Sequence, residues 1–122
     1  MKEQFVTVVQ VSPRERPVKA SIKNDLASMQ KAVGGLIEVF RWKDFLVVCN
    51  DEGKLIGMEG NRRLGNGTII AGPFFVVGLT EDDFRSLTDE EVVKYMNQFA
   101  EPEQIAQEEV ESDMGFTVIP LG

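Results

Sequence analysis

The sequence predicts an α+β fold, in which a mainly antiparallel sheet of about five or six strands packs with two helices in a single domain. Three observations carry this prediction. Several short segments rich in β-branched residues alternate in hydrophobicity with a period of two, and two other segments carry a helical stripe with recognisable ends. The third is length, because 122 residues leave room for one core and no second one.

The first predicted elements are a strand and a helix separated by a proline-rich break. Residues 4–11, QFVTVVQV, alternate and are typical of a strand, and the prolines of residues 12–17 keep the next stretch extended. The helix is expected to begin at Asn24, whose side chain suits an N-cap, and to end at Gly34 in the left-handed conformation. Three apolar residues share one stripe of this helix and are expected to be buried: Leu26, Met29 and Val33.

The middle of the chain predicts several strands. Residues 36–42, LIEVFRW, have two partly apolar faces, which a helix and a partner chain on opposite sides would explain, as would aromatic packing at a sheet edge. Residues 45–49 are continuously apolar and predict an inner strand. A turn at residues 50–53, with Gly53 at positive φ, is expected to return residues 54–58 as an antiparallel strand. Residues 68–79 predict two short strands, or one edge strand kinked at Gly72-Pro73.

The second helix has the clearest signals in the chain. Thr88 and Glu91 have the spacing of a capping box, and Leu87 can pack on Val92 across the first turn. A buried stripe is predicted to consist of Val92, Met96 and Phe99, widened by Val93. Residues 80–84 are expected to form a short helical turn before it.

The last part of the chain is acidic and then apolar. Residues 101–113 contain six acidic residues and no basic one, and are expected to be mobile or weakly helical. Residues 115–121, GFTVIPL, predict a strand that closes a sheet edge or reaches a neighbouring subunit. We therefore expect a compact domain at residues 1–99, followed at residues 100–122 by an acidic segment and a C-terminal strand or arm.

Composition excludes several chemistries. The chain has no histidine and one cysteine, Cys49, which removes histidine-based nucleophile systems, paired thiols and most transition-metal sites. Acidic pairs such as Asp82-Asp83 and Asp51-Glu52 lie where capping and solvation explain them. The sequence thus predicts no catalytic residue, no metal site and no cofactor, and we expect a protein that is not an enzyme.

The stretch GNRRLGNGT, residues 60–68, holds the candidate ligand-binding residues. It lacks the lysine and hydroxyl that follow the last glycine of a phosphate-binding loop, and no helix begins behind it, so neither nucleotide fingerprint applies. Asn66-Gly67 instead predicts a hairpin turn. The turn does not explain Asn61, Arg62 and Arg63, which could bind a carboxylate or phosphate, or the acidic segment of a second chain. Ordinary exposed surface is the alternative. Asn50, in the preceding turn, is grouped with these three.

Net charge and hydropathy bound the partners. The formal net charge is −7, so direct binding of duplex nucleic acid is not expected. The longest apolar stretch has twelve residues interrupted by glycine and proline, and no export signal precedes it, so neither membrane spanning nor export is expected. The cytoplasm is the predicted compartment, and assembly into a homo-oligomer is expected from the apolar end.

From residue 24 to residue 99 the order of motifs resembles the domain of unknown function 3846 family. The resemblance is carried by LASMQKAVGGLIEVF, VVCNDEGKLIGMEGNRRL, GTIIAGPFFVVG and FRSLTDEEVVKYMNQF. It implies an origin in a phage or plasmid of bacteria and brings no established activity, so it assigns no catalytic residue.

Two functional hypotheses follow. The first is a non-enzymatic binding module that counters host defence by binding an anionic small molecule, such as a nucleotide signal, or a host protein. The alternative is an acidic mimic of nucleic acid that inhibits a host nuclease or restriction enzyme.

Overall fold

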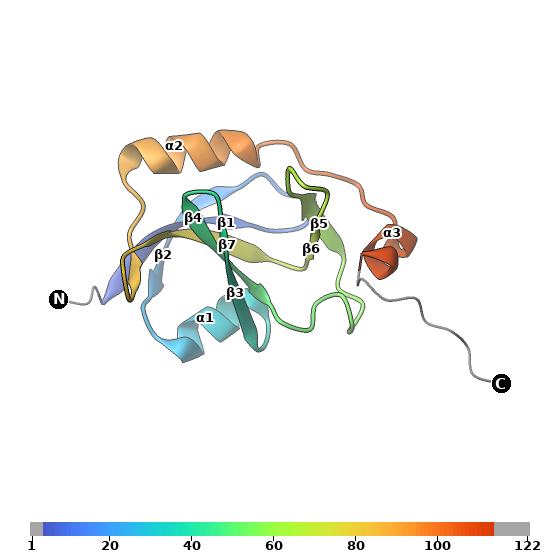
Figure 1. Cartoon of the computed structure of the whole chain (residues 1–122), viewed down its shortest axis with the longest axis horizontal. Helices are drawn as coiled ribbons and strands as arrows, with labels where there is room; N and C mark the ends of the chain where they lie inside the picture. Colours follow the sequence, from blue (N-terminus) through green and yellow to red (C-terminus); the bar gives the residue numbers. More distant parts are fainter. Residues whose placement is uncertain (1–3, 114–122) are drawn as a thin grey trace.

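One antiparallel sheet runs through the computed structural model, which describes residues 4–113 (Figure 1). Five of its strands lie in the order β2-β1-β7-β4-β3, and a short sixth strand pairs with β7. In chain order they are β1 Phe5–Val11, β2 Val18–Lys23, β3 Ile37–Trp42, β4 Phe45–Asn50, β7 Phe74–Leu79 and β8 Phe84–Arg85. The predicted α+β class, single domain and mainly antiparallel sheet are confirmed. The strand predicted at residues 115–121 lies outside the described residues.

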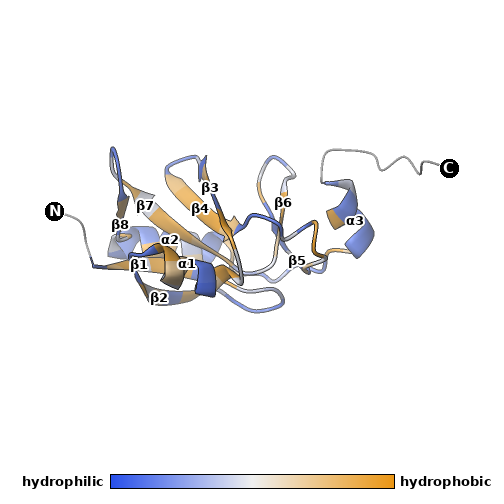
Figure 2. Cartoon of the chain, turned by 90° about the horizontal axis from the view of Figure 1, so that it is seen from below, coloured by the Kyte–Doolittle hydropathy of each residue, from blue (hydrophilic) through white to orange (hydrophobic). Residues whose placement is uncertain are grey.

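A helix covers each face of this sheet, so the sheet separates two apolar cores (Figure 1). Helix α1, Leu26–Val33, packs on one face and helix α2, Asp89–Gln98, on the other. Strand β7 supplies both cores, since Phe74 and Val76 face α2 whereas Phe75 and Val77 face α1. Figure 2 accordingly shows the central strands as hydrophobic and most connecting loops as hydrophilic.

A small second sheet lies beside the main one. The hairpin of β5, Gly60–Arg63, and β6, Ile69–Ala71, turns at Asn66-Gly67 as predicted, with Gly67 at φ 90°. Helix α3, Gln107–Ser112, packs on this hairpin through a third apolar cluster that includes Ile105 and Val110. Part of the acidic segment is therefore helical, and two apolar residues dock it to the domain.

Several strand boundaries differ from the prediction. Strand β2 was not predicted, although its residues alternate between exposed lysines and more buried apolar positions. Residues 54–58 are not a strand: the amides of Ile56 and Met58 donate to Glu52 and Gly53, which closes a compact turn, and Gly53 is not at positive φ. The hairpin forms instead between β3 and β4.

Residues 68–79 do form two strands, but β7 is central in the sheet, not at its edge. Residues 80–84 form no helical turn, and the chain there enters β8.

The helix ends are close to the prediction. Gly34 ends α1 at φ 80°, as expected, but Asp25 and not Asn24 is the N-cap, its carboxylate accepting from Ser28 N at 2.7 Å. Leu26 was expected in the core and is 58% exposed, since it precedes the buried stripe of Met29 and Val33.

In α2 the capping box of Thr88 and Glu91 is confirmed. Tyr95 is buried, whereas Val93, which was expected to widen the stripe, is 61% exposed. The reason is helical spacing, because Tyr95 lies three residues after the buried Val92, and Val93 points away from that line.

Candidate functional site

Asn61 is a buried structural residue at the start of the β5–β6 hairpin. Its side chain is 0% exposed. The amide nitrogen donates to the carbonyl oxygens of Val11 and Gly72 at 2.9 Å each, and the amide oxygen accepts from Arg62 Nη1 at 2.7 Å. Asn61 therefore joins the end of β1 to the bend between β6 and β7, and both of its donor hydrogens are used within the chain.

Arg62 is buried as well, with 1% of its surface exposed. Nη2 donates to Glu15 O at 2.6 Å and to Phe99 O at 3.0 Å, while Nε also reaches Phe99 O at 3.2 Å. Burial lowers the pKa of the guanidinium, and the charge of Glu103 opposes that shift. The expectation that Asn61 and Arg62 are presented on the surface is wrong. Two chain segments meet at Arg62: the turn that follows β1, which contains Glu15, and the end of α2, which contains Phe99. The backbone carbonyl groups of these two residues lack partners in a strand or helix, and a planar guanidinium with several donors can bind both.

Arg63 faces outward, where it meets the acidic segment of its own chain. Its Nη1 lies 3.3 Å from Glu103 Oε1, and its Nη2 contacts Glu109. The backbone amide of Arg63 also donates to Glu103 Oε2 at 3.0 Å. The acidic segment of a second chain was one predicted partner for these arginines, but for Arg63 the same chain supplies the acidic segment.

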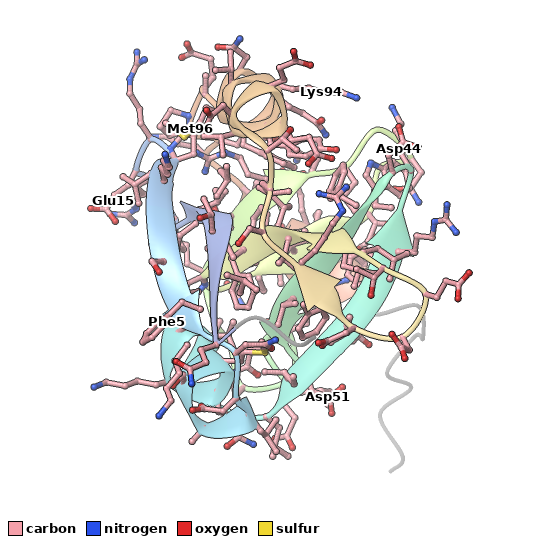
Figure 3. All side chains as sticks on the ribbon, turned by 90° about the vertical axis from the view of Figure 1, so that its left-hand side faces the viewer. Phe5, Glu15, Asp44, Asp51, Lys94 and Met96 are labelled. Carbon is pink, nitrogen blue, oxygen red and sulfur yellow. The ribbon has the colours of Figure 1, made fainter. Side chains whose placement is uncertain are left out.

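Asn50, the fourth predicted site residue, lines a cavity. Its Nδ2 donates to Val33 O at 3.2 Å, and its oxygen accepts from Glu52 N at 2.8 Å. These bonds fix the end of β4 against the end of α1. Figure 3 shows the neighbouring Asp51 at this end of the β3–β4 hairpin, with Asp44 at the opposite end.

The cavity that Asn50 lines, called here the β3–β6 cavity, has a volume of about 250 Å³. It lies between the β3–β4 hairpin, the turn at residues 51–57 and β6. Phe40 of β3, Leu55 of the turn and residues 69–71 of β6 supply its apolar lining. Alternate residues of a strand project to the same face of the sheet, so Phe40 lies on the same face of β3 as Glu38, and both line the cavity.

An ion pair stands at the rim of the β3–β6 cavity. Lys54 Nζ lies 2.6 Å from Asp113 Oδ2, and both side chains are about one quarter exposed, at 26% each. Asp113 also accepts from Ile69 N at 2.8 Å. Burial alone would raise the pKa of Asp113, but the hydrogen bonds from Lys54 and Ile69 outweigh it and lower that pKa. This pair ties the residue that follows α3 to the turn at residues 51–57.

Two further carboxylates, Glu38 and Asp51, lie at the β3–β6 cavity. Cys49 Sγ donates to Glu38 Oε1 at 3.8 Å across the paired strands β3 and β4. Burial, reinforced by the charge of Glu38, raises the pKa of Cys49 to about 12. The thiol is thus protonated at neutral pH and is a poor nucleophile.

A second, more open groove beside α3 has a volume of about 790 Å³. Its charged lining includes Glu59, Glu103 and Glu109, which are already paired with Arg14 and Arg63. Because each of these carboxylates already has a cationic partner within the chain, the β3–β6 cavity is the stronger candidate site.

Sequence reasoning missed most of this site. Phe40 lies in a strand that was predicted almost as observed, but Lys54 belongs to a segment that was predicted as a strand and forms a turn, and Asp113 lies 59 positions from its partner Lys54. One sequence pattern did point to the site. Both faces of the strand predicted at residues 36–42 are partly apolar, but the sequence does not show what the second face contacts.

The fold and this site define a small α+β domain with an acidic cavity above an apolar floor. Residues 6–100 match the family model described as "Domain of unknown function (DUF3846)", and the chain belongs to that family. The resemblance inferred from the sequence is thereby confirmed, and α3 lies beyond the matched residues. No curated protein and no solved structure matches the chain. Among residues 4–113, none of the helices has the length and apolar character needed to cross a membrane.

Proposed function

We propose that this protein is a non-catalytic binding module whose site is the β3–β6 cavity and whose ligand is a compact organic cation with an apolar body. The supporting observation is the charge of the cavity. Lys54 and Asp113 neutralise each other, whereas Glu38 and Asp51 form no salt bridge within residues 4–113. A net negative charge therefore lies above an apolar floor, which suits an amine or amidine on a hydrocarbon or aromatic stem.

Size and aromatic content support the same ligand class. The volume of about 250 Å³ lies below the range of about 300–1,000 Å³ usual for drug-sized ligands, which favours a molecule smaller than a nucleotide. Phe40 in the lining adds an aromatic ring that attracts cations. The small volume disfavours the nucleotide expected from the sequence, and the face of the aromatic ring disfavours an anion.

The binding role rests on the chemistry of the side chains. The chain has no histidine, and the thiol of Cys49 is held protonated. The family resemblance implies a phage or plasmid origin, and we propose that the protein acts in the bacterial cytoplasm against host defence by sequestering its ligand. The mimicry of nucleic acid is less favoured, because Glu103, Glu109 and Asp113 are paired with cations of the same chain.

Calorimetry and thermal shift with a ligand panel test this proposal. The panel contains small alkyl and aryl amines and amidines, the carboxylates of the same carbon skeletons, and mono- and cyclic nucleotides. We expect saturable binding and a raised Tm for the amines alone, with affinity that falls as salt is added. Heat from nucleotides without heat from amines would overturn the cation assignment.

The chain offers a matched control for the site. Asp51→Asn removes a carboxylate at the cavity, and we expect it to weaken amine binding about fivefold, a loss of about 1 kcal/mol. Glu52→Gln removes the neighbouring exposed carboxylate, which does not line the cavity, and is expected to change the affinity less than twofold. Equal effects of the two variants would show that amines respond to surface charge and not to the cavity.

A further inference from the structure

We propose that the outer edge of β3 binds an extended peptide segment of a partner protein by strand addition. This inference goes beyond the capture of a small molecule, because it uses the free backbone groups of β3. In the described part of the chain, β3 ends the sheet and pairs only with β4, opposite the other edge strand, β2 (Figure 3).

The hydrogen-bond register shows which backbone groups of β3 are not used by β4, its one strand partner among residues 4–113. Asp51 N donates to Leu36 O at 2.8 Å, and the regular pairing of β3 with β4 continues from that pair. Hydrogen-bonded and non-hydrogen-bonded pairs alternate along an antiparallel ladder. Glu38 and Phe40 therefore direct their backbone groups to β4, whereas Ile37, Val39 and Arg41 direct theirs to the open edge.

The two edges of the sheet differ in how they are protected. On β2 the same reasoning starts from the hydrogen bond that Asn24 N donates to Gln4 O. Alternation along the register with β1 then directs the backbone groups of Lys19 and Lys23 outward. Exposed lysines on an edge strand discourage pairing with another chain. On β3 the central outward residue is Val39, an apolar residue that is 40% exposed. The β3 edge is thus the more receptive of the two.

Side chains beside the β3 edge specify the chemistry of the partner. A residue placed opposite Glu38 shares its face of the sheet and the neighbouring negative charge of Asp51, which calls for lysine or arginine. A residue opposite Val39 meets an exposed apolar side chain, and a residue opposite Phe40 meets a half-buried aromatic ring, which calls for β-branched side chains. The expected segment is therefore apolar and β-branched with one basic residue, and such a partner is complementary to a chain of net charge −7.

Charge disfavours a second copy of this chain at the same edge. Two copies related by a two-fold axis would pair residues of the same face, because an antiparallel pair keeps opposite residues on one side of the sheet. Glu38 and Arg41 lie on opposite faces of β3. No symmetric pairing can then place one against the other, and Glu38 would meet an aromatic residue or a second Glu38.

Fluorescence anisotropy with a labelled peptide tests this inference on the full chain. The core of the peptide is Thr-Ile-Val-Lys-Val, which runs antiparallel to β3 with its lysine opposite Glu38. We expect saturable binding with a Kd on the order of 100 µM or tighter. A peptide with proline at the central valine loses one donor at the β3 edge, and we expect it to bind at least about tenfold more weakly. Equal binding of the two peptides would overturn the proposal.

Two protein variants localise the interaction. Val39→Pro removes an outward amide that β4 does not use, so the fold should tolerate it as edge strands do, and we expect at least about a tenfold loss of peptide affinity. Lys19→Pro removes an outward amide on β2 and is the matched control, with no change expected. If both variants bind like the unmodified chain, β3 is not the docking edge.

A charge exchange covers the case in which Val39→Pro does not fold. Glu38→Lys is expected to weaken binding of the lysine peptide and to be rescued by a peptide with glutamate at that position, about fivefold in each direction. Absence of rescue would overturn the assigned register. If light scattering shows a dimer that Val39→Pro converts to a monomer, the occupant is a second copy, which would overturn the assignment to a partner protein.

The outcomes separate this inference from the proposed function. Val39 does not line the β3–β6 cavity, so Val39→Pro should weaken peptide binding at least about tenfold and leave amine binding intact. A protein that binds the peptide but none of the amines would support strand addition alone.

Discussion

Replacing Arg62 by methionine tests the structural role of the buried guanidinium. Methionine keeps an unbranched stem and removes all the donors. The carbonyl oxygens of Phe99 and Asn61 then lose buried partners, as does the amide oxygen of Asn61. Glu15 is exposed, so its carbonyl group can turn to water.

The expected magnitude follows from these lost hydrogen bonds. Each buried acceptor left without a donor costs about 1–3 kcal/mol, and the three together would exceed the effect of any surface ion pair. Part of this loss is returned, since folding of the variant no longer buries a charged group whose pKa is lowered by that burial. We therefore expect Arg62→Met to reduce the free energy of unfolding by about 2–4 kcal/mol, out of a total of about 5–15 kcal/mol.

Arg63→Met is the matched control, because the neighbouring side chain has the same length and charge and lies outside the core. Its ion pairs with Glu103 and Glu109 are at the surface, where such pairs contribute about 1 kcal/mol or less. The assay is urea unfolding followed by circular dichroism and by the fluorescence of Trp42, the sole tryptophan, with the m-value checked for constancy. The reasoning would be refuted if Arg62→Met stayed within about 1 kcal/mol of the unmodified protein, or if Arg63→Met were the more damaging change.

Three further predictions concern Glu91, Cys49 and Gly60. The side-chain hydrogen bond from Arg85 lowers the pKa of Glu91 from its ordinary 4.5 to about 2, against the opposing effect of burial. The stability that this carboxylate contributes is therefore present above about pH 4.5 and is lost as the pH falls towards 2. Glu91→Gln keeps a capping side chain but should flatten the loss measured by urea unfolding between pH 5 and 3, and an unchanged slope would contradict this. Cys49, with a pKa of about 12, should react with a disulfide reagent at pH 8 far more slowly in the native protein than in urea, and similar rates would count against its burial. A Cβ at Gly60 would lie 2.9 Å from both Ile105 and Val110. Gly60→Ala should therefore displace α3 and raise the rate of amide hydrogen exchange at residues 107–112. Exchange rates that stay unchanged would contradict this prediction.

Local sequence signals were enough for much of the fold. The capping box of Thr88 and Glu91, the helix end at Gly34 and the hairpin at Asn66-Gly67 depend on residues four or fewer positions apart, so each could be recognised in the sequence. The fully buried pattern of β4 identified an inner strand for a similar reason, since a continuous apolar run requires cover on both faces. The turn at residues 51–57 was mistaken for a hairpin, because turn residues followed by an apolar stretch also suit a returning strand.

The site could not be predicted to the same extent. A sequence shows that Asn61 and Arg62 are polar and next to glycine, a pattern that suits an exposed loop, but it does not show which carbonyl groups will meet them.

What the sequence by itself determined was the fold class, the helix ends, the family and the absence of histidine chemistry. Only the tertiary structure decided that Arg62 is buried and that an acidic cavity lies beside β3, the strand that ends the sheet within residues 4–113. The physical reason is distance along the chain. The carbonyl partners of Arg62 at Phe99 and Glu15 lie 37 and 47 positions away, and Lys54 meets Asp113 across 59 positions. Such partners come together only when the strands pair and the helices dock, so the burial and the charge of a site are properties of the folded chain.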